Sequence, residues 1–227
     1  MDEPPQTIAR AAGPRGEVVL RRRGTGDDAV DELIVNGAFA MDSAETESEQ
    51  ALADHAWPGA SVLVGGLGLG FTVTALLDRR VGSIDVVEIE DALVGWAYGG
   101  VTPRLARVAN DPGVRLWVDD IRAVLTDPSR EVGPAGPWDA ILLDVDNGPD
   151  FLIHADNAAL YSGEALRRAY GWLRPGGVLA IWCQGPHAGL WAELQAQSPT
   201  AREERHVVQR GRHRIAYVIY TVRLPHL

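Results

Sequence analysis

The chain has 227 residues, of which 46% are hydrophobic, and its formal net charge at pH 7 is −10. This length and composition suit a soluble globular chain with a sizeable core, and the negative charge argues against a nucleic-acid partner, which requires a basic face. No apolar run approaches the roughly 20 residues that span a bilayer, and the N-terminus lacks the pattern of a secretory signal. We therefore expect a cytoplasmic protein without a membrane partner.

The first part of the chain predicts a small β unit followed by a helix. Residues 1–16 are rich in Pro, Ala and Gly, and we expect them to be flexible. Residues 17–41 contain short apolar runs around Asn36-Gly37, a strong hairpin signal, and predict an antiparallel β unit. Residues 43–57 begin with a serine and acidic residues and predict a helix.

From residue 58 onward, apolar runs alternate with helical patterns. The runs are rich in Val, Ile and Leu, which indicates strands buried on both faces of a parallel sheet. We predict an α/β fold with a doubly wound, mostly parallel seven-stranded sheet. Its expected strands are 61–66, 83–90, 114–120, 138–146 and 177–184, followed by an antiparallel pair, 202–210 and 214–224. The expected organisation is a flexible terminus (1–16), a hairpin-and-helix appendage (17–57) and a cofactor-binding domain (58–227).

The segment VLVGGLGLG, residues 62–70, ends the first of these strands in a glycine-rich loop. Glycine reaches positive φ without penalty and lets a ligand approach the backbone, while the following helix offers free N–H groups. A turn between a buried strand and a buried helix explains the same pattern. We take Gly66, Leu67, Gly68 and Gly70 as candidate cofactor-binding residues.

Acidic residues end three further strands of the predicted sheet. Ligands of open α/β sheets bind at the carboxyl ends of the strands, so these residues are expected to gather at one site. Glu88 follows Gly68 by 20 residues, a suitable spacing for a carboxylate that accepts hydrogen bonds from ribose hydroxyls. Helix capping is the less favoured alternative explanation for Glu88, Glu90 and Asp120. The strand-end residues are Glu88, Ile89, Glu90, Asp119, Asp120, Asp144 and Asp146.

These motifs occur in an order and spacing that resemble the Rossmann-like S-adenosylmethionine-dependent methyltransferases, and most closely the spermidine synthases. The segments that carry the resemblance are VLVGGLGLG, VVEIE, WVDD, WDAILLDVDNGP and LRPGGVLAIW, and DELIVNGAFAMDSAETESEQALADHAW extends it upstream. The resemblance implies that the loop at Gly66 and Gly68 lies beside the methionine-like end of the cofactor and that Glu88 binds the ribose hydroxyls. It further implies that Asp120 meets the adenine amino group and that Asp144 faces the transfer centre.

Two positions depart from the spermidine synthase pattern. Gly68 stands where these enzymes have a loop Asp that binds the amine of the aminopropyl group, and Glu49 stands where they have a Tyr that positions the attacking amine. Both departures weaken the case for aminopropyl transfer. Absence of the loop Asp also removes a charge that would repel the carboxylate of intact S-adenosylmethionine. Methyl transfer to a small amine-bearing or cationic acceptor is therefore the favoured prediction.

The segment after the fourth strand supplies candidate substrate contacts. Asp144 is the candidate catalytic residue, because a transferred group needs a neutral nucleophile that has lost its proton. Asp146 and Asn147 either contact the substrate or form a turn, since Asp-Asn-Gly-Pro is a strong turn sequence. Tyr161 and Glu49 complete the candidate substrate-binding set, and His154, Asp156 and Asn157 are weaker candidates in the same segment as Tyr161.

Other functions remain as alternatives. The first is a polyamine aminopropyltransferase that uses decarboxylated S-adenosylmethionine. Less favoured are an NAD-dependent oxidoreductase, because the loop lacks the G-x-G-x-x-G spacing, and a non-catalytic domain. The scattered histidines and the single cysteine, Cys183, predict no metal site and no disulfide. A homodimer is one possible state of assembly, which the sequence leaves open.

Overall fold

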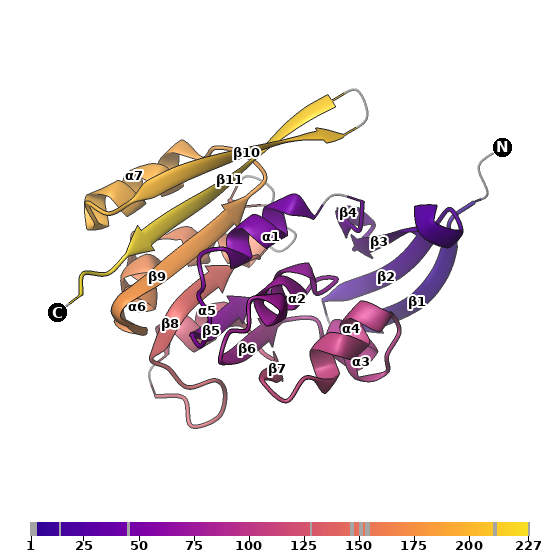
Figure 1. Ribbon diagram of the computed structural model, residues 1–227, viewed down its shortest axis with the longest axis horizontal. Coiled ribbons are helices and arrows are strands. Elements are labelled where there is room, and N and C mark those ends of the chain that lie inside the picture. Colours follow the sequence, from indigo (N-terminus) through magenta and orange to yellow (C-terminus); the bar gives the residue numbers. More distant parts are fainter. Residues whose placement is uncertain are drawn as a thin grey trace.

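Two β-sheets organise the computed structural model of the chain (Figure 1). In the part of the chain that the structure describes, four strands form an N-terminal sheet and seven form the central sheet. The described residues are 4–13, 15–44, 46–127, 129–145, 148–149, 152, 155–210 and 213–226.

The N-terminal sheet is antiparallel, with its strands in chain order. Its strands are β1 (Gln6–Gly13), β2 (Gly16–Arg23), β3 (Val30–Val35) and β4 (Ala38–Asp42). The hairpin predicted at Asn36-Gly37 is confirmed, because Val35 pairs with Ala38 and both turn residues have positive φ, 52° and 77°. Such angles suit a two-residue turn whose twist matches that of the strands.

The expectation of a flexible N-terminus up to Gly16 is wrong for β1. This strand pairs with β2 along its length, from Gln6 opposite Arg22 to Gly13 opposite Gly16. Its side chains are exposed or only partly buried, so it lacks the alternation of apolar residues that indicates a strand in sequence. Backbone hydrogen bonds to a neighbouring strand hold such an edge strand, and sequence pattern does not reveal them.

The central sheet has the order β10-β11-β9-β8-β5-β6-β7, and the predicted seven-stranded α/β fold is confirmed. The five strands from β5 to β9 are mutually parallel, while β11 runs antiparallel to both β9 and β10. The strand order reverses at β5, which lies between β6 and β8, so the ligand site of such a sheet is expected there. Its strands are β5 (Ser61–Gly65), β6 (Ser83–Glu88), β7 (Val114–Val118), β8 (Trp138–Leu143), β9 (Leu173–Cys183), β10 (Arg202–Arg210) and β11 (His213–Arg223).

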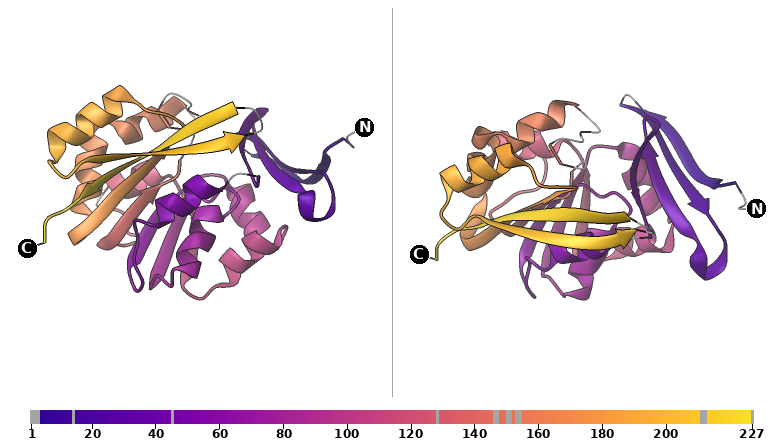
Figure 2. Two further views of the ribbon diagram at one scale, coloured as in Figure 1. Left: turned by 45° about the horizontal axis from the view of Figure 1, so that its top comes forward. Right: turned by 90° about the horizontal axis from the view of Figure 1, so that it is seen from above.

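Helices cover both faces of the central sheet (Figure 2). Residues of α1 to α4 share one hydrophobic core with the N-terminal sheet, and residues of α5 to α7 share a second core. Along β5, Val62 and Val64 belong to the first core and Leu63 to the second, as the alternation of a strand requires. The helices are α1 (Glu47–Ala53), α2 (Phe71–Asp78), α3 (Asp91–Tyr98), α4 (Pro103–Asn110), α5 (Ile121–Thr126), α6 (Gly163–Gly171) and α7 (Ala188–Gln197).

Three local details differ from the sequence predictions. Helix α1 begins after Thr46 rather than at Ser43, because Ser43 exchanges two hydrogen bonds with Asp31 and so extends the pairing with β3. Helix α4 was not predicted, although Thr102 caps it and a proline occupies its first position. Strand β9 already begins at Leu173, so the Arg-Pro-Gly-Gly segment lies within it.

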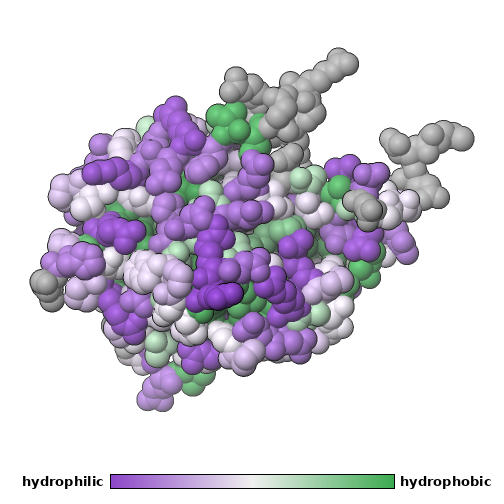
Figure 3. Space-filling view, viewed as in Figure 1, coloured by the Kyte–Doolittle hydropathy of each residue, from purple (hydrophilic) through white to green (hydrophobic). Residues whose placement is uncertain are grey.

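The face seen in Figure 3 is mostly hydrophilic, and hydrophobic residues appear there only in small separate patches.

Candidate functional site

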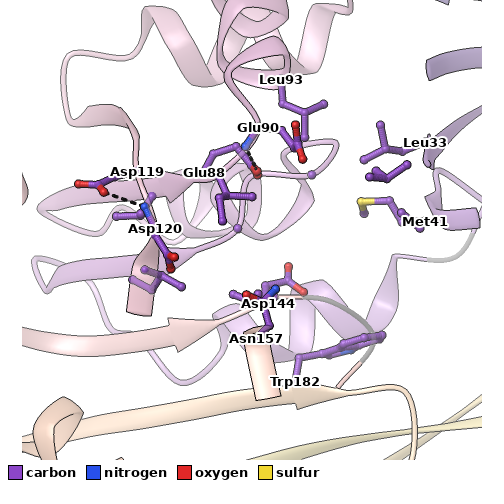
Figure 4. A pocket seen from close by; sticks show the side chains of 18 of the residues that line it. Leu33, Met41, Glu88, Glu90, Leu93, Asp119, Asp120, Asp144, Asn157 and Trp182 are labelled. Carbon is purple, nitrogen blue, oxygen red and sulfur yellow. Dashed lines mark hydrogen bonds between the residues drawn. The ribbon is translucent and has the colours of Figure 1, made fainter. Parts of the chain in front are cut away.

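A pocket of about 930 Å³, a volume that includes solvent at its mouth, opens where the carboxyl ends of β5, β6, β7 and β8 meet (Figure 4). The N-terminal sheet supplies the facing wall, and α1, β9 and a 3-10 helix (Ala155–Tyr161) complete the lining. The residues that line the pocket are Leu33, Val35, Ala40, Met41, Glu49, Gly66, Gly68, Val87, Glu88, Ile89, Glu90, Leu93, Asp119, Asp120, Ile121, Asp144, Val145, Asn157 and Trp182.

The glycine loop between β5 and α2 forms the floor of this pocket. Gly66 has a φ of 97°, and an added Cβ would collide with the carbonyl oxygen of Asp144. Gly68 has a φ of 49°, and an added Cβ would lie 2.6 Å from Sδ of Met41. Backbone conformation and close packing therefore both favour glycine at these two positions.

Glu88 is buried at the end of β6 and is held by backbone donors. Its Oε2 accepts from the N–H of Leu67 at 2.8 Å, and its Oε1 accepts from the N–H of Glu90 at 2.9 Å. Burial raises the pKa of Glu88, against the lowering effect of these hydrogen bonds. The N–H of Gly68 is a third backbone donor to this carboxyl group. A carboxylate has about four lone-pair sites, so these donors still leave acceptor capacity for a ligand in the pocket.

Asp119 and Asp120 lie at one end of the pocket, as Figure 4 shows. Asp119 forms an ion pair with Arg130. Asp120 caps α5 through the N–H of Arg122 at 2.8 Å and forms an ion pair with the same side chain at 2.6 Å. Burial acts to raise the pKa of Asp120, but the bonds with Arg122 outweigh it and hold the pKa below its ordinary value. The capping role is thus observed, while contact with adenine stays a prediction.

Asp144 follows β8 and lies close to Asn157 in Figure 4. Its Oδ2 accepts a hydrogen bond from the hydroxyl of Thr72, at the start of α2, at 2.7 Å. Burial raises the pKa of Asp144 to about 6, although the bond from Thr72 acts in the opposite direction. The side chain therefore exchanges its proton near neutral pH.

Glu49 reaches the same part of the pocket from α1 and is buried. Its Oε2 accepts a hydrogen bond from the hydroxyl of Ser48 at 2.6 Å. Burial and the negative charges of Asp144 and Asp42 raise the pKa of Glu49 to about 7. Glu49 and Asp144 thus form a pair of carboxyl groups that repel each other when both are ionised.

An apolar wall faces these carboxylates. Leu33 and Met41 come from the N-terminal sheet and lie near Leu93 in Figure 4, while Trp182 of β9 lies beside Asp144 and Asn157. The Trp182 ring packs on Tyr217 with centroids 5.2 Å apart. The pocket lining therefore combines carboxyl groups with apolar side chains.

The structure brings most of the predicted site residues into one pocket. Three of them do not line it. Leu67 is buried in the core and contributes its N–H to Glu88, and Gly70 is the N-cap of α2. The hydroxyl of Tyr161 donates to the carbonyl oxygen of Val145 at 2.8 Å, so it supports the end of β8. Asp146, Asn147 and His154 lie outside the described residues. The predicted residues that line the pocket are Glu49, Gly66, Gly68, Glu88, Ile89, Glu90, Asp119, Asp120, Asp144 and Asn157.

Sequence reasoning missed the apolar lining and the hydroxyl of Thr72. In sequence, Leu33, Met41 and Trp182 are indistinguishable from ordinary core residues of their strands. Their role depends on how the N-terminal sheet packs over the loop, and no local signal carries that information.

Across the described ranges, no group of three or more His, Cys, Asp or Glu side chains is placed to hold a metal ion. In the same ranges, no helix is both long and apolar enough to cross a bilayer.

Comparisons with known proteins identify the fold. No protein-family model matches the chain, and no curated protein matches its sequence. Among solved structures, the chain is similar to a spermidine synthase in complex with the transition-state analogue AdoDATO, with a TM-score of 0.74, 14% identity, and coverage of 95% of this chain and 73% of that chain. A spermidine synthase from Thermotoga maritima gives a TM-score of 0.70, 13% identity, and coverage of 95% and 72%.

A third structure, TrmN from Thermus thermophilus, is similar over 79% of this chain and 48% of that chain, with a TM-score of 0.52 and 20% identity. Together these structures show that the chain has a Rossmann-like methyltransferase fold related to that of spermidine synthase, as the sequence motifs predict.

Proposed function

We propose that the protein is an S-adenosylmethionine-dependent transferase that moves a methyl group to a small amine-bearing or cationic acceptor. The observation that carries this proposal is the acidic pocket beside the glycine loop. Its described lining contains six carboxyl groups and no Lys, Arg or His. Such a lining suits a ligand with a sulfonium and an acceptor with an amine, because opposite charges attract strongly in a partly buried site.

The residues present fit an adenosyl cofactor. Glu88 retains lone pairs toward the pocket for the ribose hydroxyls, and the loop at Gly66 and Gly68 allows a close approach to the backbone. Asp119 and Asp120 lie at the far end, where the adenine would bind in this arrangement. Asp144 and Glu49 then face the reacting end of the cofactor.

The bound cofactor would supply an electrophilic methyl group on a positively charged sulfur. The chain's own task is to deliver a neutral nitrogen in line with it. In the proposed step, a carboxylate of the Asp144–Glu49 pair takes the proton from the acceptor ammonium. The nitrogen lone pair then forms the bond to the methyl carbon, and the carbon–sulfur electrons return to sulfur. A pKa of about 6 at Asp144 suits a general base at neutral pH.

Two features favour methyl over aminopropyl transfer. Gly68 offers no carboxylate to the free amine of a decarboxylated cofactor, and Glu49 replaces the tyrosine expected of a spermidine synthase. An intact cofactor also brings its own carboxylate, which backbone N–H groups of the loop are suited to accept.

Aminopropyl transfer is the second candidate function. It is favoured by the likeness to spermidine synthases over 95% of the chain, which includes the N-terminal sheet, and by the acidic pocket. A polyamine-like acceptor would suit either reaction.

Calorimetric titration with S-adenosylhomocysteine, decarboxylated S-adenosylmethionine and NAD in parallel tests the proposal. We expect S-adenosylhomocysteine to bind and to stabilise the fold by about 2.7 kcal/mol at a hundredfold excess over its Kd. Binding of NAD, with no binding of either adenosyl sulfur compound, would refute it.

A further inference from the structure

Met41 connects the N-terminal sheet to the glycine loop. It extends from β4, and its Sδ accepts a hydrogen bond from the backbone N–H of Leu69 at 3.3 Å. The same sulfur lies 2.6 Å from the position of a Cβ on Gly68. Met41 also lines the pocket, beside Leu33 and Leu93 (Figure 4). The thioether therefore rests directly on the part of the loop that faces the pocket.

This contact pairs a backbone donor of the loop, next to the pocket-lining Gly68, with a sulfur acceptor. A thioether is a weak acceptor, so the N–H of Leu69 is paired with a poor partner. A ligand carboxylate would form a shorter and stronger, charge-assisted bond with the same N–H. Methionine has three flexible torsions and can leave the loop at small cost.

We propose that Met41 determines which cofactors the pocket accepts, by closing the end of the pocket that receives the cofactor's tail. A cofactor with an amino-acid tail displaces the thioether from the N–H of Leu69, whereas a nucleoside thioether without that tail leaves it in place. The inference rests on the proposed function, because the tail end is defined by the orientation of the adenosyl group given above.

Binding measurements on three proteins test this role. The ligands are S-adenosylhomocysteine, which has the amino-acid tail, and 5′-methylthioadenosine, which lacks it. For Met41→Ala we expect S-adenosylhomocysteine to bind roughly three- to tenfold more tightly than to the wild type, because no contact must be displaced. The affinity for 5′-methylthioadenosine should remain within about twofold. Met41→Leu keeps the bulk over Gly68 but lacks the sulfur acceptor, so its ratio of affinities should lie between those of the wild type and Met41→Ala.

A spectroscopic readout follows the side chain itself. The sequence contains two methionines, Met1 and Met41. An NMR sample labelled at the methionine methyl groups therefore gives at most two resonances, one of which belongs to Met41. Saturation with S-adenosylhomocysteine should shift the Met41 methyl resonance strongly, and 5′-methylthioadenosine should shift it little. Met41→Ala identifies the resonance by its disappearance.

The outcomes separate this inference from the proposed function. If both ligands bind and the ratio of their affinities is the same in the wild type, Met41→Ala and Met41→Leu, the role of Met41 is refuted and the proposed cofactor stands. Weaker binding of S-adenosylhomocysteine to Met41→Ala also refutes it. If neither ligand binds the wild type, both the cofactor assignment and the role of Met41 are refuted.

Discussion

The carboxyl groups of the pocket fall into two sets that differ in their partners. At the end of β6 and β7, Glu88 is held by backbone N–H groups and Asp120 by Arg122 and the start of α5. Near α1 and the end of β8, Asp144 and Glu49 each accept a hydroxyl hydrogen bond, from Thr72 and Ser48. The first set has N–H donors that fix its oxygens, and the second set has no cationic partner in these contacts.

This difference teaches what each set is suited to do. Carboxylates fixed by N–H donors are oriented acceptors, appropriate for holding the hydroxyl and amino groups of an adenosyl ligand. The pKa values of about 6 and about 7 at Asp144 and Glu49 instead place proton exchange near neutral pH. We therefore assign binding to the first set and proton transfer to the second, and the following predictions test that division.

The largest expected effect is on turnover in Asp144→Asn. An amide cannot accept the acceptor's proton, so we expect the rate constant to fall by roughly 10²- to 10⁴-fold, the usual contribution of a general base. The Kd of S-adenosylhomocysteine should change little. Single-turnover kinetics with the methyl acceptor and calorimetry measure the two quantities. A variant that kept its rate but lost cofactor affinity would place Asp144 in the binding set.

The next effect is on stability in Glu49→Gln. In the folded protein Glu49 keeps its proton up to a pKa of about 7, whereas the unfolded chain ionises near 4.5, so the folded state binds more protons between these values. The free energy of unfolding of the wild type therefore falls as the pH rises from about 4.5 through about 7. A glutamine at this position does not ionise, so Glu49→Gln lacks this loss. The free energy of unfolding of the variant minus that of the wild type should therefore increase by on the order of 3 kcal/mol when the pH is raised from 4.5 to 8.

Urea unfolding of the wild type and of Glu49→Gln at pH 4.5 and at pH 8 measures this difference. Glu47→Gln, at an exposed position of the same helix, is the matched control and should show no such change with pH. An equal difference between Glu49→Gln and the wild type at both pH values would show that Glu49 is not held in its protonated form.

A smaller effect is expected on cofactor affinity in Glu88→Gln. The amide keeps the size of the side chain but turns a donor toward one of the backbone N–H groups that hold Glu88, and it removes the negative charge. We expect S-adenosylhomocysteine to bind roughly tenfold more weakly, through loss of charge-assisted bonds to the ribose. Thermal unfolding without ligand separates this effect from lost stability, and Glu164→Gln on α6 is the control. Unchanged affinity would remove Glu88 from the binding set.

The smallest effect concerns cofactor choice in Gly68→Asp. Asp tolerates a φ of 49° better than most residues, but its side chain would meet Met41. We expect only a few-fold shift of affinity from intact toward decarboxylated S-adenosylmethionine, because the new carboxylate repels one tail and attracts the other. Combining it with Met41→Ala should enlarge the shift. Titration of both cofactors measures it, and a shift toward the intact cofactor would contradict the electrostatic reasoning.

The fold was predictable where burial leaves a pattern. The local sequence is sufficient to predict strands from the Val, Ile and Leu runs of β5 to β9 and a hairpin from Asn36-Gly37. Strand β1 is not predictable in this way, because its side chains are mostly exposed and its neighbour holds it through the backbone. The site divides in the same way. Glycines and strand-end acids are visible in sequence, whereas Met41 and Trp182 become pocket residues only through packing between sheets.

The central claim is the transfer of a methyl group from the intact cofactor, and product analysis tests it most directly. The protein would be incubated with a panel of small amines, including putrescine, and with either S-adenosylmethionine or its decarboxylated form, and the products identified by mass spectrometry. We predict S-adenosylhomocysteine and a methylated amine from the intact cofactor, with both products formed far more slowly by Asp144→Asn. Formation of 5′-methylthioadenosine and spermidine from the decarboxylated cofactor and putrescine, with no methylated amine, would contradict the claim and establish aminopropyl transfer instead.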